Sequence, residues 1–326
     1  MNECKGKLGE GSYGCVYTPP LPCVGKSLKR GNKRLVGKIF SKPELANDEE
    51  KIMEIVAKID PKGKFTTPLR DTCSVIPTEK LKSECAHARS ASMIMKQLVY
   101  DHKGIDLCNF MKSEDYDILD HLEGIKNVAN ALKALASAGY SHRDIKPPNI
   151  MLYEESMYLT DFGLMLPFGR IYEEEQDYVL SFNYEYYPPE FKIYYDLKMA
   201  TSPITDISDM KAFIVNDVRA NYSESENIIR FKTVEDTVSS LIDSFKTSEL
   251  LEAGLRMHAS KIDVFGFGMT FMKMFIKSKK TNKSKLIRKK LYYILEKCMD
   301  PNPLTRIESS KLVMELSLLT KLVKER

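Results

Sequence analysis

Residues 142–149 read His-Arg-Asp-Ile-Lys-Pro-Pro-Asn, and residues 161–163, twelve positions after Asn149, read Asp-Phe-Gly. This short span contains a candidate proton acceptor, Asp144, and a cation, Lys146, two residues later. Asn149 and Asp161 carry oxygens of the kind that a hard cation such as Mg²⁺ prefers. Phosphoryl transfer depends mostly on positioning and on neutralisation of charge. The span therefore predicts a phosphoryl-transfer site, and the rest of the chain is interpreted around it.

The composition is that of a globular protein. The chain has 326 residues, of which 43% are hydrophobic and 29% charged, and its net charge is +4. This length suits one large domain or two small ones. The charge is too small to indicate a nucleic acid or a membrane as partner, so we expect neither, and a monomer by default. We find no apolar run of about eighteen residues and no apolar region at the start, which predicts a cytoplasmic protein without a transmembrane segment or signal peptide.

The seven cysteines are scattered and form no C-x-x-C pair. This pattern predicts reduced thiols in a cytosolic or nuclear setting. Cys73, Cys85 and His87 could also be imagined as zinc ligands. Their spacing is irregular and a fourth ligand is not obvious, so we favour the first interpretation.

Three glycines near the start, Gly9, Gly11 and Gly14, have the spacing G-x-G-x-x-G. Glycines let backbone N–H groups approach phosphate oxygens. A dinucleotide-binding fold would continue into a helix, whereas the β-prone residues 15–17 and three prolines follow here. We therefore predict a strand, a phosphate-binding glycine loop and a second strand. The alternative is a hairpin turn without a ligand.

A lysine in an apolar segment follows the glycine loop. Residues 35–40 read Leu-Val-Gly-Lys-Ile-Phe, which predicts a strand that carries Lys38. The alternative for Lys38 is an ordinary solvated lysine. Residues 43–59 show apolar positions at helical spacing and begin with proline, which suits a first helical turn.

One acidic residue of this helix is expected to pair with Lys38. Glu49, Glu50 and Glu54 compete for this role. We favour Glu49, with Glu50 next, because Ile52 and Met53 follow Glu49 by three and four residues and share its face.

Two further segments complete the pattern up to the catalytic stretch. Residues 92–98 predict a buried strand that runs into a linker. Residues 115–138 predict an amphipathic helix that Gly139 ends.

These motifs resemble those of eukaryotic-type protein kinases across nearly the whole chain. Residues 188–190, Pro-Pro-Glu, stand where A-P-E is expected, 263–268 resemble D-V-W-S-x-G, and 300–306 resemble D-P-x-x-R. The resemblance implies an α+β fold in one kinase domain, with a small antiparallel β lobe and one helix over about 1–97, hinge included. A larger, mainly helical lobe would cover 98–326. It also implies that Asp263 braces the catalytic loop and that Arg306 pairs with Glu190.

The resemblance implies transfer of the γ-phosphoryl group of Mg–ATP, with Mn²⁺ as an alternative metal, to Ser or Thr hydroxyls of protein substrates. Lys146 favours the serine/threonine class. By this resemblance the catalytic residues are Asp144, Lys146 and Lys38, and the metal ligands are Asn149 and Asp161. The expected ATP-binding residues are Leu8, Gly9, Gly11, Gly14, Val16, Lys38, Glu49, Met95 as gatekeeper, and Gln97 and Leu98 in the hinge. Residues 11–23 are also similar to kinases of large nucleocytoplasmic DNA viruses, which implies a viral protein of the host cytoplasm or virion.

Several features depart from the family pattern. Residues 173–177 carry four carboxylates, which either substitute for a phosphate that Arg143 would bind or form a solvated loop. Asn183 stands where the family has threonine. An insert at about 191–262 is predicted to add helices to the larger lobe. We expect these helices to replace one that is reduced elsewhere, in preference to a role in substrate docking. We interpret the basic stretch 277–290 as a solvated face, in preference to a surface that attracts acidic substrates or nucleic acid. The rival functions are a scaffold with little catalysis and a kinase of small molecules, which the intact motifs argue against.

Overall fold

A computed structural model describes residues 6–11, 14–28, 34–89, 94–113, 115–171, 184–191, 256–279 and 285–325, together with a few residues between 216 and 254. The acidic run 173–177, Asn183 and most of the insert 191–262 lie outside these ranges. The chain forms two compact units, Met1–Gly104 with Tyr158–Gly163, and Ile105–Met157 with Leu164–Arg326. The first compact unit thus ends at Gly104, whereas the sequence predicted a lobe boundary at about residue 97. None of the described helices is long and apolar enough to cross a membrane.

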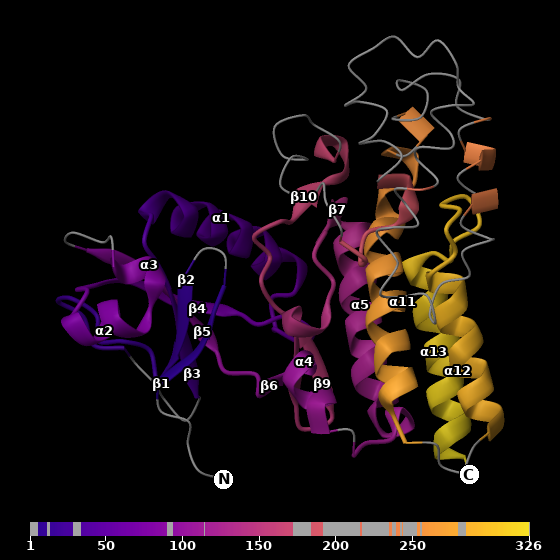
Figure 1. Ribbon diagram of the computed structural model, residues 1–326, viewed down its shortest axis with the longest axis horizontal. Helices are drawn as coiled ribbons and strands as arrows, with labels where there is room; N and C mark the ends of the chain where they lie inside the picture. Colours follow the sequence, from indigo (N-terminus) through magenta and orange to yellow (C-terminus); the bar gives the residue numbers. More distant parts are fainter. Residues whose placement is uncertain are drawn as a thin grey trace. The chain divides into compact units, whose positions relative to one another are not determined.

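An antiparallel sheet of five strands forms the centre of the first unit (Figure 1). Its order is β1 (Gly6–Glu10), β2 (Gly14–Thr18), β3 (Leu35–Phe40), β5 (Met95–Asp101) and β4 (Leu69–Val75). β1 pairs with β2 across the glycine loop, so the predicted strand–loop–strand arrangement is confirmed. The β-branched and aromatic residues of β2 and β3 explain why these short segments become strands.

Helices α1 (Pro43–Ile59), α2 (Glu79–Glu84) and α3 (Ala86–Arg89) complete the first unit. The predicted bounds of α1 are confirmed, and Pro43 lies in its first turn. Met53 and Val56 are buried on the inward face of α1. The side chain of Thr78 accepts a hydrogen bond from the N–H of Leu81 and so caps α2.

Two disulfides in the first unit contradict the predicted reduced thiols. Cys15 of β2 bonds to Cys85, and Cys23 bonds to Cys73 of β4. The partners are 70 and 50 residues apart, so the pairing arises from the fold and not from local spacing. Because Cys73 and Cys85 belong to different disulfides, the zinc set imagined with His87 is not formed. Among the described cysteines, Cys108 and Cys298 are free thiols.

Four helices dominate the second unit, and they run side by side (Figure 1). They are α5 (Leu122–Ser137), α11 (Ile262–Lys277), α12 (Lys285–Cys298) and α13 (Ser309–Lys324). The predicted apolar face of α5 is buried, and Gly139 follows it with φ +81°. The helix begins later than predicted, because the 3₁₀ turn η2 (Ile118–His121) precedes it and the Asp117 side chain accepts from the N–H of Leu119.

Short elements connect these helices and position the catalytic stretch. They are β6 (Ile105–Asp106), α4 (Leu107–Phe110), η1 (Met111–Ser113), β7 (Tyr140–Ser141), η3 (Pro147–Asn149), β8 (Ile150–Tyr153), β9 (Ser156–Leu159), β10 (Leu166–Pro167), η4 (Phe168–Arg170) and η7 (Ala259–Lys261).

The basic stretch 277–290 is not uniformly solvated. Residues 280–284 lie outside the described part of the chain. Arg288 of α12 is buried and donates to Asp117 at 3.1 Å and to the Ser278 hydroxyl at 2.9 Å. At least this one cation therefore has a structural role.

Candidate active site

Lys38 of β3 lies at the centre of the charged group in the first unit. Its ammonium donates to Glu49 Oε2 at 2.7 Å and to Asp161 Oδ1 at 2.9 Å. Glu49 is therefore the partner of Lys38, as predicted. Glu50, the second choice, accepts instead from Lys96 of β5. The contact joins β3 to α1 and to the Asp-Phe-Gly segment.

The surroundings of Lys38 hold it in the charged form. Burial opposes the charge, but the carboxylates of Asp161 and Glu49 outweigh it and raise the pKa of Lys38 above its usual value. Glu49 is buried and also accepts from the Tyr100 hydroxyl at 2.7 Å. Burial, with Glu49 beside it, raises the pKa of Tyr100 well above normal. A fixed cation next to the partly exposed carboxylate of Asp161 suits the oxygens of a phosphate and a metal ion.

The three glycines of the loop have different surroundings. A Cβ at Gly14 would lie 1.8 Å from the carbonyl oxygen of Ile39, so the close approach of β3 demands glycine there. Nothing lies within 4 Å of a Cβ at Gly9 or Gly11. This space beside the backbone suits a phosphate-binding loop, while the N–H of Gly11 itself donates to the carbonyl of Gly14 at 2.9 Å. The neighbouring Leu8 is exposed and Val16 is half-buried.

The predicted hinge was misplaced. Met95, Gln97 and Leu98 lie inside β5, which pairs with β3 on one side and β4 on the other. Gln97 is buried, and its side chain accepts from the N–H of Leu21 at 2.9 Å and donates to the carbonyl of Leu21 at 3.0 Å. These residues are therefore not a linker that offers backbone groups to adenine. The strand continues to Asp101, and the polar, glycine-containing residues 102–104 were the signal for its end.

In the second unit, Asp144 is held by three side chains. Lys146 Nζ lies 3.0 Å from Asp144 Oδ2, and Asn149 Nδ2 donates to the same oxygen at 2.7 Å. Asn149 also donates to the Asp144 carbonyl at 2.9 Å. Its amide nitrogen is thereby engaged, which leaves the amide oxygen as the atom that can bind a cation. The third partner is Tyr184, whose hydroxyl donates to Asp144 Oδ1.

The sequence motifs did not identify Tyr184 as a residue of the site. Burial and the negative charge of Asp144 raise its pKa, so the phenol stays protonated and can donate. Its ring packs against Tyr187 with centroids 4.8 Å apart, and the Tyr187 hydroxyl donates to the carbonyl of Arg143 at 2.6 Å. The tyrosine-rich run 184–187 was the available signal.

Asp263 braces the catalytic stretch as predicted. Its carboxylate accepts from the N–H groups of His142 at 2.6 Å and Arg143 at 2.8 Å. Burial raises the pKa of Asp263, while His142 and these two N–H groups act in the opposite direction. The brace holds Arg143 at φ +65°, a left-handed conformation that non-glycine residues seldom adopt.

The predicted pair of Glu190 with Arg306 is also confirmed. The guanidinium donates from Nη1 and Nη2 to the two carboxylate oxygens at 2.6 and 2.8 Å. Both side chains are buried, and this bidentate geometry fixes the end of the segment that carries Tyr184.

The structure thus assembles two groups of predicted residues. Lys38, Glu49 and Asp161 belong to the first unit, and Asp144, Lys146 and Asn149 to the second. Asp161 in the first unit and Asn149 in the second each carry an oxygen donor of the kind that a hard divalent cation prefers. A carboxylate held beside an ammonium can accept the proton of a hydroxyl group.

Comparison with known proteins agrees with these motifs. The family model described as "Protein kinase domain" matches residues 3–207. "Extracellular signal-regulated kinase 2" of Dictyostelium discoideum is 27% identical over 165 residues. The alignment covers 50% of this chain and 39% of that protein, so the chain spans about two fifths of its relative's length.

Proposed function

Because the chain belongs to the protein kinase domain family, we propose that it transfers the γ-phosphoryl group of ATP to Ser or Thr hydroxyls of proteins. The observation that carries this proposal is Lys38, whose ammonium is bonded to both Glu49 and the Asp-Phe-Gly aspartate, Asp161. A structural lysine needs no such pair of carboxylates. A lysine that must present a fixed charge to phosphate oxygens does.

Each charged residue receives one role in the proposal. Lys38 binds the α- and β-phosphates, and Glu49 fixes its position. Asp161 and the amide oxygen of Asn149 hold Mg²⁺, or Mn²⁺, which neutralises phosphate charge when it is bound. Gly9 and Gly11 leave room for the phosphates beside the backbone, because nothing lies within 4 Å of a Cβ at either position.

The acceptor side is assigned to the Asp144 group. Asp144 orients the substrate hydroxyl and accepts its proton, and Lys146, which lies 3.0 Å from Asp144, balances the charge of the transferred group. The choice of Ser or Thr over Tyr rests on the H-R-D-x-K order of residues 142–146. The viral origin, and with it a location in the host cytoplasm or virion, rests on the similarity of residues 11–23.

Labelled ATP and a protein mixture test this function in the wild type, Asp144→Asn and Asp161→Ala. We expect labelling to fall by about 100-fold or more in both variants, because each removes a charge from the reacting group. Asp120→Asn is the matched control, since Asp120 is an exposed aspartate on η2. Equal labelling in all four proteins would contradict the assignment. Phosphotyrosine as the main product would contradict the Ser/Thr preference.

A further inference from the structure

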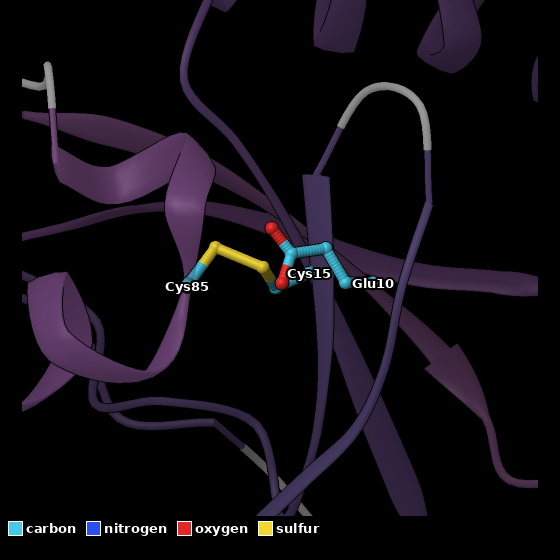
Figure 2. Close-up of side chains that lie close together, drawn as sticks. All are labelled: Glu10, Cys15 and Cys85. Carbon is cyan, nitrogen blue, oxygen red and sulfur yellow. A yellow bond between two sulfur atoms is a disulfide. The ribbon is translucent and has the colours of Figure 1, made fainter.

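Glu10, Cys15 and Cys85 meet beside the glycine loop. Figure 2 shows the Glu10 carboxylate at the end of β1, pointing toward the sulfur pair that joins β2 to the segment between α2 and α3. The ligand atoms of the three residues lie within 4.8 Å of one another. Within the described ranges, no other group of three or more His, Cys, Asp and Glu residues meets in this way.

The carboxylate is held in place independently of the sulfurs. Glu10 Oε1 accepts from the N–H of Ala86 at 3.0 Å, and Lys7 pairs with the other oxygen. His87 Nε2 lies 3.9 Å from the same Oε1 atom and is hydrogen-bonded to the carbonyl oxygen of Gly11 at 2.9 Å, which leaves Nδ1 as its ligand atom. An anionic oxygen therefore lies within 4.8 Å of both sulfurs, and an imidazole lies beside that carboxylate.

We propose that, once the disulfide is reduced, Cys15, Cys85, Glu10 and His87 bind one Zn²⁺ ion. Two thiolates, a carboxylate and an imidazole make the four-ligand set of a closed tetrahedral site. With zinc–sulfur bonds of about 2.3 Å, tetrahedral geometry puts the two sulfurs about 3.8 Å apart. The 6.1 Å separation of the two Cα atoms allows this after rotation of the cysteine side chains.

The charges and the access route also suit a metal ion. Three anionic ligands exceed the two positive charges of zinc by one, and the ammonium of Lys7 beside Glu10 balances the difference. Both cysteines are fully buried, whereas Glu10 and His87 are partly exposed. An ion can therefore enter from the side of the carboxylate and the imidazole and reach sulfurs that are shielded from water.

Reduction of the disulfide followed by zinc binding balances in electrons and protons. A thiol or phosphine reductant supplies two electrons, and the Cys15–Cys85 bond takes them up with two protons to give two thiols. Zinc binding then releases these two protons to solvent, because only the thiolates are ligands. In either state the ends of the glycine loop stay fastened to the α2–α3 segment, by a disulfide or by a metal ion.

The second disulfide provides a matched comparison. The neighbour of Cys73 Sγ is the amide nitrogen of Gln97, at 3.3 Å, which donates and cannot ligate a metal ion. Among the described residues, no carboxylate or imidazole joins Cys23 and Cys73 in a ligand group. This pair is therefore expected to remain without zinc after reduction.

A cobalt titration of the full chain tests the proposal, after reduction with a phosphine in the absence of oxygen. We expect one equivalent of Co²⁺ to bind, with cobalt–thiolate charge-transfer absorption and the intense visible bands of tetrahedral cobalt, and Zn²⁺ to displace it. Cys15→Ser with Cys85→Ser should abolish the charge-transfer absorption. Glu10→Gln and His87→Ala should each weaken binding at least about tenfold. Cys23→Ser with Cys73→Ser should bind as the wild type does.

Measurements on the wild type guard against variants that fail to fold. Zinc should protect Cys15 and Cys85 of the reduced protein from alkylation, and leave Cys23 and Cys73 as reactive as without metal. The oxidised protein should bind no cobalt. The proposal is overturned if the reduced wild type binds no cobalt, if cobalt binds without thiolate absorption, or if protection falls on Cys23 and Cys73. Unchanged affinity in Glu10→Gln or His87→Ala would overturn that residue's place in the site.

Discussion

At the scale of single residues, the direction in which a side chain leaves helix α1 decides whether Glu49 or Glu50 pairs with Lys38. Consecutive helix positions differ by about 100°, so the two carboxylates leave α1 on different sides. Glu49 is buried against Lys38 and Tyr100, and Glu50 accepts from Lys96. The sequence predicted this choice because Met53, on the face of Glu49, had to point inward, and it is buried.

We expect Glu49→Gln to lower kcat/KM for ATP by about tenfold to 100-fold with little change in thermal stability. The amide can still accept from Tyr100, whereas the full negative charge that fixes Lys38 is lost. Steady-state kinetics and thermal unfolding measure the two effects. Glu50→Gln is the control, since it weakens a partly exposed pair worth about 1 kcal/mol or less. Equal kinetic losses in both variants would show that Lys38 does not depend on Glu49.

Other contacts at this scale could not be predicted. Tyr184 donates to Asp144 from a position 40 residues later in the chain. No local periodicity relates two such residues, and the family pattern offers threonine, one position earlier, for this place. The contact exists because Asp263 and the Glu190–Arg306 pair fix both segments within the second unit.

At the scale of elements, boundaries were harder to predict than the elements themselves. The bounds of α1 and β3 were correct because proline, apolar spacing and a flanked lysine mark them. β5 runs on to Asp101, three residues past the predicted hinge. Its buried Gln97 looks like a linker residue in the sequence, yet it is satisfied by the backbone of Leu21. A buried polar side chain with both partners supplied is part of the core.

The packing of β2 against β3 gives a prediction for the glycine loop. Gly14→Ala should destabilise the first unit by about 3 kcal/mol, because its Cβ would meet the Ile39 backbone at 1.8 Å and backbone yields less than a side chain. Gly9→Ala should change stability by less than about 0.5 kcal/mol, because its Cβ meets nothing within 4 Å. Urea unfolding of the two variants makes the comparison. Equal stability would show that β2 can move away from β3.

At the scale of the whole molecule, the division of the chain into two units follows the two kinds of pattern in the sequence. Short β-prone segments with one long helix, α1, and two short ones, α2 and α3, fill the first unit, and long amphipathic helices dominate the second. The fold class was predictable for this reason. The two disulfides were not, because strand pairing brings Cys15 and Cys85 together across 70 residues.

Reduction should therefore destabilise the two units unequally. By chain entropy, disulfides that close loops of 70 and 50 residues each stabilise the fold by about 4 kcal/mol. Together they contribute less than the sum of the two values, because one loop encloses the other. Both disulfides lie in the first unit, whereas the described cysteines of the second unit, Cys108 and Cys298, are free. Calorimetry with and without a phosphine should show one unfolding transition lowered by more than about 10 °C and the other unchanged. Added Zn²⁺ should raise the lowered transition again in the reduced wild type, but not in Cys15→Ser with Cys85→Ser. Equal lowering of both transitions would mean that the cross-links stabilise the molecule as one cooperative unit, and no lowering would mean that they contribute nothing to its stability.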